Sequence, residues 1–145
     1  MEKIKVGFLG AGSIAHAMAA TIAQMPEAEL WAVAARDAKR AEIFAQQYGF
    51  TKSYGSYEEL VQDEKVQLIY ISTPHSHHAQ HALLCIEHGK AVLCEKAFTG
   101  NARQAEEVLN EAQRRKVFVT DAIWPRYMPL ARTLRELVQD EDAGG

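Results

Sequence analysis

The sequence predicts a doubly wound α/β fold with a mostly parallel Rossmann sheet, and three observations carry this prediction. Short apolar segments alternate with amphipathic segments along most of the chain. The apolar segments are nearly unbroken, which is typical of strands buried on both faces of a sheet. The connections are short, and strand–helix–strand units of this kind form right-handed crossovers with helices on both faces.

The expected elements follow one another in order. We expect strands at 4–9, 30–35, 68–72, 91–94 and 117–122, and helices at 14–25, 38–48, 77–88 and 101–115. Pro26, Gly49 and Gly89 follow the expected helices as stop signals. Capping patterns begin at Ser56 and Asn101. Residues 1–122 are therefore predicted to form a dinucleotide-binding domain, and residues 123–145 a crossover segment and helix that lead to a C-terminal domain absent from this chain.

Composition excludes several classes of protein. The chain has 145 residues and a formal net charge of −3, with 16 basic and 19 acidic side chains. A nucleic-acid binder that relies on clustered cations is excluded, and no apolar stretch reaches the roughly 18 residues needed to span a bilayer. Cys85 and Cys94 lie in apolar surroundings without a C-x-x-C pattern, which predicts reduced thiols and a cytoplasmic protein.

The first strand is followed by the glycine pattern Gly10-Ala11-Gly12-Ser13-Ile14-Ala15, which opens a helix. Gly10 permits a tight turn, Gly12 lets the backbone approach a pyrophosphate, and Ala15 keeps the helix close to the sheet. A diphosphate at this helix start meets free N–H groups and the positive end of the helix dipole. The pattern predicts a dinucleotide site.

The end of the second strand predicts which dinucleotide binds. An NAD site usually has an acidic residue here that binds the adenosine ribose, but this strand ends in Ala35 and Arg36. The Arg36 guanidinium can pair with a 2′-phosphate, with Arg40 as a second cation. We therefore expect NADP, with NAD less favoured. In the alternative, both arginines are solvated surface charges and Asp37 is either a helix cap or the ribose acid.

Four histidines lie close together after the strand at 68–72, namely His75, His77, His78 and His81. His77 and His81 share a helix face, which suggests zinc, but no nearby Cys, Asp or Glu completes a ligand set. Thr73 and Pro74 end the strand at the edge where open α/β sheets bind ligands. We therefore expect histidines that line a cofactor site or the surface, and no metal.

Glu95 and Lys96 end the next strand at the same edge. Lys96 can donate to a substrate oxygen or act as an acid or base there. From the residues alone, the alternative is that Lys96 pairs with Glu95 or lies in solvent and has no role in catalysis.

These motifs together resemble the N-terminal domain of the Gfo/Idh/MocA oxidoreductase family. The resemblance covers nearly the whole chain and rests on residues 6–15, 73–78 and 89–96. Residues 122–129 are similar to a segment of the subgroup that contains dimeric dihydrodiol dehydrogenase and glucose-fructose oxidoreductase. Ala97 departs from the family's E-K-P motif, and His75 stands where asparagine is common.

The resemblance implies a role for each matching residue. It implies pyrophosphate contacts from Gly10, Gly12, Ser13 and Ile14, a 2′-phosphate contact from Arg36, nicotinamide-side positions for Thr73, Pro74 and His78, and cofactor contacts from Glu95, Lys96, Trp124 and Arg126. Lys96 is the implied catalytic residue.

The implied activity is NADP-dependent hydride transfer at a hydroxyl or carbonyl carbon of a sugar, polyol or cyclic diol. Family members continue into a second α/β domain, so we expect this chain alone to be inactive and the full-length protein to be a homo-oligomer without nucleic-acid or membrane partners. The alternative is a non-catalytic dinucleotide-binding or sensing module.

Overall fold

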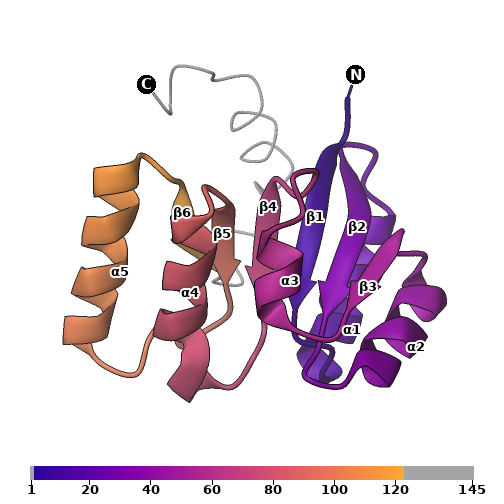
Figure 1. Ribbon diagram of the computed structural model, residues 1–145, viewed down its shortest axis with the longest axis horizontal. Helices are drawn as coiled ribbons and strands as arrows, with labels where there is room; N and C mark the ends of the chain where they lie inside the picture. The colour runs from indigo at the N-terminus through magenta and orange to yellow at the C-terminus, as the bar shows by residue number, and fades with distance from the viewer. Residues whose placement is uncertain (1, 123–145) are drawn as a thin grey trace.

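A six-stranded sheet forms the centre of the molecule in a computed structural model that describes residues 2–122. Every strand pair is parallel, and the strand order is β3-β2-β1-β4-β5-β6 (Figure 1). The strands are β1 (Ile4–Leu9), β2 (Ala28–Ala34), β3 (Lys52–Tyr54), β4 (Leu68–Ile71), β5 (Ala91–Cys94) and β6 (Val119–Asp121). The predicted doubly wound α/β fold is confirmed.

The helices lie close to their predicted positions. They are α1 (Ser13–Ala23), α2 (Ala38–Tyr48), α3 (Tyr57–Val61), α4 (His78–Glu87) and α5 (Ala102–Arg115), with a short 3₁₀ turn at His75–His77 before α4. The strand β3 was not predicted from the sequence pattern. The crossover segment and helix predicted within residues 123–145 lie outside the described residues. No helix within residues 2–122 is long and apolar enough to cross a membrane.

Alternating strand residues build two apolar layers, one on each face of the sheet. Val6 and Phe8 of β1 belong to the layer that includes α1 and α2, whereas the next residue, Leu9, belongs to the layer that includes α3, α4 and α5. In β4, Tyr70 belongs to the first layer and Ile71 to the second. This period of two is the pattern of a strand with both faces covered.

Side-chain caps fix where the helices begin. Asp37 accepts a hydrogen bond from the Lys39 backbone N–H (2.9 Å) at the start of α2. Ser56 accepts from the Glu59 backbone N–H at 3.2 Å, and Asn101 accepts from that of Gln104 at 2.9 Å. These bonds satisfy N–H groups that a helix leaves unpaired in its first turn.

The strand order places a crevice between β1 and β4. The chain first builds β2 and β3 on one side of β1, then crosses back to build β4, β5 and β6 on the other. Loops after β1 and β4 therefore leave in opposite directions at the carboxyl edge, and open α/β sheets bind ligands at this point.

A buried carboxylate ties the edge strand to the rest of the sheet. Asp63 accepts hydrogen bonds from Tyr54 Oη (2.8 Å), Trp31 Nε1 (3.0 Å) and the Lys65 backbone N–H (2.9 Å). Burial by itself would raise the pKa of Asp63, but these bonds together hold it below its usual value. The ionised carboxylate therefore contributes to stability.

We expect Asp63→Asn to lower the free energy of unfolding by about 2 kcal/mol at pH 7, because hydrogen bonds to a charged group are lost. A carboxyl whose pKa is lowered by folding stabilises above its unfolded pKa, about 4, and loses this contribution as the pH falls through its folded pKa. Urea unfolding of both proteins at pH 7 and pH 3 measures the effect. The difference should shrink at pH 3, and an equal difference at both pH values would contradict the assignment.

Candidate functional site

A pocket of about 540 Å³ lies at the carboxyl ends of β1, β2 and β4. Its lining consists of Gly10, Ala11, Gly12, Ser13, Ile14, Ala35, Arg36, Asp37, Arg40, Tyr57, Ser72, Thr73, Pro74 and His75. The structure thus brings the glycine loop, the arginines after β2 and the turn after β4 into one site. This is the crevice that the strand order creates.

The glycine loop passes very close to the end of β4. Gly10 has a φ of 105°, a conformation that side chains rarely adopt, and a Cβ there would lie 2.9 Å from Ser72 Oγ. Gly12 differs, because a Cβ at Gly12 would meet no atom within 4 Å. Gly10 is therefore needed to build the loop, whereas the missing side chain of Gly12 leaves room in the pocket.

The first turn of α1 suits an anionic group. Gly12 is the N-cap residue, and no side chain caps the helix. Ser13 and Ile14, the first two helical residues, line the pocket. Their backbone N–H groups belong to the orphan donors of a helix start, at the positive end of the helix dipole. The open space at Gly12 and these donors fit the diphosphate of a dinucleotide.

Two guanidinium groups lie at the β2 end of the pocket. Arg36 is exposed and lines the pocket, and Arg40 Nη2 donates to the Ala11 carbonyl of the glycine loop at 3.3 Å. Asp37 lies between them in the sequence, but its carboxylate caps α2. The geometry therefore favours the helix-cap alternative for Asp37 over the ribose-acid alternative.

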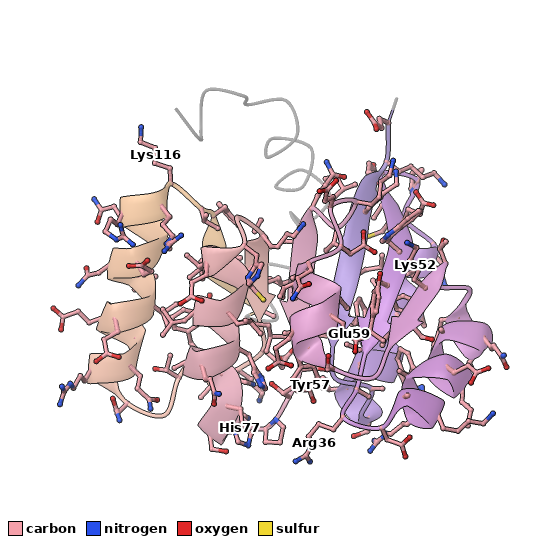
Figure 2. The ribbon with its side chains drawn as sticks, viewed as in Figure 1. Arg36, Lys52, Tyr57, Glu59, His77 and Lys116 are labelled. Atoms are coloured by element: carbon pink, nitrogen blue, oxygen red, sulfur yellow. The ribbon has the colours of Figure 1, made fainter. Side chains whose placement is uncertain are left out.

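Tyr57 is a pocket residue that the sequence analysis missed. It is the first residue of α3 and faces the arginine end of the pocket, and Figure 2 shows it at the same edge of the molecule as Arg36. Burial raises the pKa of Tyr57, although Arg36 and Arg40 act to lower it. The capping pattern at Ser56 predicted a helix start here and was the only signal that pointed to this position.

The turn after β4 supplies Thr73, Pro74 and His75 to the pocket. His78 does not line it, because its ring is fully buried behind the turn. His78 Nε2 lies 2.7 Å from the Thr73 carbonyl oxygen, and His78 Nδ1 lies 2.7 Å from that of Ala97. Direct contact between His78 and a cofactor stays a prediction, but this geometry places the ring one layer further back.

His81 is also buried against this turn. Its Nδ1 lies 2.7 Å from Thr73 Oγ1, and its ring meets the edge of Tyr57 at a centroid distance of 4.7 Å. Burial, helped by His77 and His78, lowers the pKa of His81 to about 4. His81 is therefore a neutral hydrogen-bonding partner near neutral pH. Within residues 2–122, no three His, Cys, Asp or Glu side chains are arranged to hold a metal ion.

The segment after β5 separates Glu95 from Lys96. The Glu95 side chain is buried and accepts a hydrogen bond from Tyr70 Oη at 2.5 Å. Lys96 is exposed, and neither residue lines the pocket. The Lys96–Ala97 peptide bond is cis. Trp124 and Arg126, the other predicted contacts, lie outside the described residues.

Comparisons with known proteins agree on the identity of this domain. Residues 4–122 match the Gfo/Idh/MocA family model, described as an oxidoreductase family with an NAD-binding Rossmann fold. The chain is 43% identical over 137 residues to trans-1,2-dihydrobenzene-1,2-diol dehydrogenase of Mus musculus, covering 93% of this chain and 41% of the relative. It is 47% identical over 120 residues to D-xylose 1-dehydrogenase (NADP(+)) of Hypocrea jecorina, covering 80% of this chain and 31% of the relative.

A solved structure has the same fold as this chain. The 3-ketoreductase KijD10 from Actinomadura kijaniata, crystallised with NADP and TDP-benzene, matches 96% of this chain with a TM-score of 0.84 at 26% identity. The match covers 43% of the KijD10 chain. Since the family model spans most of the sequence, the chain belongs to the Gfo/Idh/MocA oxidoreductase family, and residues 4–122 are its NAD-binding Rossmann domain.

Proposed function

We propose that this chain is the NADP-binding part of an oxidoreductase. The observation that carries the proposal is a single pocket in which an uncapped helix start and two arginines face the same space. The helix start suits a diphosphate, and the arginines suit the 2′-phosphate that distinguishes NADP from NAD. The relative from Hypocrea jecorina is an NADP(+) enzyme by name, and KijD10 was crystallised with NADP.

The proposed reaction moves a hydride between the nicotinamide and a carbon that bears a hydroxyl or carbonyl group. A bound nicotinamide supplies the hydride acceptor or donor. The proposed substrate is a sugar, polyol or cyclic diol, because the two named dehydrogenases act on a dihydrodiol and on D-xylose.

Lys96 is the proposed proton carrier. It follows β5 at the same edge of the sheet as the pocket, and its side chain is exposed. A lysine there can take the hydroxyl proton during oxidation, or donate to the carbonyl oxygen during reduction. Glu95, in contrast, is held in the interior by Tyr70.

Substrate turnover is expected to need more chain than these 145 residues. The chain spans 41% of the length of the relative from Mus musculus and 31% of the length of the relative from Hypocrea jecorina. Hydride transfer needs a substrate held at near-attack distance with water excluded. We propose that contacts from a further domain provide this, as in the family.

Titration of the 145-residue chain with NADPH and NADH by calorimetry tests the proposal. We expect saturable binding of NADPH, at least tenfold tighter than that of NADH, because of the extra phosphate contacts. No measurable binding of either nucleotide, or equal binding of both, would contradict it. A parallel assay with NADP⁺ and D-xylose or a trans-dihydrodiol should show almost no turnover, and rapid turnover would contradict the need for a further domain.

The compartment and assembly of the protein are also proposals. Cys85 and Cys94 are free and buried, which supports the cytoplasmic compartment predicted from the sequence. A homo-oligomer of the full-length protein is proposed from the family resemblance alone.

A further inference from the structure

The buried face of α4 is polar near its start. His78 is fully buried and His81 is 8% exposed, and they lie one helical turn apart on the face that continues with Ala82 and Cys85. A histidine buried in an otherwise apolar layer needs hydrogen-bonding partners to offset its desolvation. The partners of both histidines include the turn after β4.

Both histidines contact the same residue, Thr73. His81 Nδ1 lies 2.7 Å from the Thr73 hydroxyl oxygen, and His78 Nε2 lies 2.7 Å from the Thr73 carbonyl oxygen. The side chain and the main chain of Thr73 are thus fixed separately. Thr73 itself lines the pocket directly after β4.

His78 also reaches the segment after β5. Its Nδ1 lies 2.7 Å from the carbonyl oxygen of Ala97, the residue after Lys96. Carbonyl oxygens accept hydrogen bonds, so each of these contacts is a hydrogen bond when the facing ring nitrogen carries a proton. A neutral imidazole carries one N–H, so His78 donates to one of these two carbonyls and lies against the other. The ring therefore lies between the turn that carries Thr73 and the turn that carries Lys96.

We propose that His78 and His81 are positioning residues that set the nicotinamide end of the pocket without touching the cofactor. Neither ring lines the pocket, yet both contact Thr73, and His78 contacts the neighbour of Lys96. This inference rests on the proposed function, because it assumes that the nicotinamide half of NADP lies against the turn after β4.

The two ends of the pocket are held differently, which makes the inference testable. The adenosine end is built from the glycine loop and the arginines after β2, and within residues 2–122 neither of these forms a hydrogen bond with His78 or His81. The ring of His81 does contact Tyr57 beside the arginines, so His78→Leu, which leaves that contact in place, is the cleaner of the two tests. Adenosine 2′,5′-bisphosphate occupies only this end, whereas NADPH occupies both. Loss of positioning should therefore weaken the binding of NADPH more than the binding of adenosine 2′,5′-bisphosphate.

The experiment compares His81→Leu, His81→Asn and His78→Leu in the 145-residue chain. Calorimetry gives the Kd of NADPH and of adenosine 2′,5′-bisphosphate, and thermal unfolding gives Tm. We expect His81→Leu and His78→Leu to raise the Kd of NADPH about tenfold, because each leaves a buried group of Thr73 unpaired, and to change that of the bisphosphate less than about twofold. His81→Asn, which keeps a polar atom near Nδ1, should recover most of the NADPH affinity.

His88→Leu is the matched control. His88 lies at the end of the same helix, and within residues 2–122 its side chain hydrogen-bonds only to the Leu84 carbonyl, so neither Kd should change. Thr73→Val should resemble His81→Leu, and the double variant should be no weaker than either single variant, because one hydrogen bond is removed in all three. If His78→Leu does not fold, the comparison of Thr73→Val with His81→Leu still tests the positioning role.

Two results would overturn the inference while the proposed function stands. One is an unchanged Kd for NADPH in His81→Leu. The other is an equal rise in the Kd of NADPH and of adenosine 2′,5′-bisphosphate, which would indicate a structural role only. A parent chain that binds neither ligand would overturn the proposed function, and the positioning role would fall with it.

Discussion

Gly12→Val should abolish tight dinucleotide binding while leaving the fold intact. A Cβ at Gly12 meets no protein atom within 4 Å, and Gly12 has a φ of −87° that valine adopts without strain. The added side chain therefore enters the space in front of the first turn of α1, where the diphosphate is proposed to bind. Loss of two or more charge-assisted hydrogen bonds predicts a Kd for NADPH at least about a hundredfold higher.

The free energy of unfolding of Gly12→Val should fall by only about 1 kcal/mol, because valine is a poorer N-cap residue than glycine but makes the unfolded chain less flexible. Gly10→Ala is the contrasting variant. Its φ of 105° and the 2.9 Å approach to Ser72 Oγ predict a loss of at least about 2 kcal/mol of stability. Urea unfolding and NADPH titration of both variants separate the two roles.

One result would count against this division of roles between the two glycines. If Gly12→Val bound NADPH as tightly as the parent chain, the pyrophosphate would have to lie elsewhere, and the site built around the start of α1 would be wrong. A large loss of stability in Gly12→Val would show instead that this side-chain space is filled by the protein.

The parts of the site that could be predicted are those with local signals. The order of Gly10, Gly12 and Ala15 after an apolar strand specifies a strand, a tight turn and a helix start, because each glycine has a backbone reason to be there. Arg36 and Arg40 could be placed since they follow a strand that ends at the same edge. Such positions depend on sequence neighbours alone.

The parts that could not be predicted depend on contacts between distant segments. Lys52–Tyr54 has no apolar run, and it forms β3 because β2 offers an edge and because Tyr54 donates to Asp63. Tyr57 follows this unrecognised strand and could not be placed near the pocket. Likewise, the histidine spacing does not show that His78 and His81 point inward, because that depends on the exact start of α4.

Arg36→Ala should remove most of the preference for NADPH. We expect the Kd of NADPH to rise about tenfold or more and that of NADH to change less than about twofold, because a planar guanidinium pairs with the 2′-phosphate and NADH lacks this group. Calorimetric titration of the 145-residue chain with both nucleotides measures the ratio. The preference of the parent chain should also shrink as salt rises, since Arg36 is exposed and its charge is screened.

Arg40→Ala is expected to behave differently. Arg40 donates to the Ala11 carbonyl of the glycine loop, so removal of the Arg40 side chain should weaken the binding of NADH as well as that of NADPH. Arg103→Ala, at an exposed position on α5, controls for the loss of one positive charge and should change neither Kd. If Arg36→Ala left the ratio of the two affinities unchanged, the 2′-phosphate would not be read by this guanidinium. Selectivity would then have to come from Arg40, from Asp37, whose Oδ1 caps α2, or from residues beyond 122.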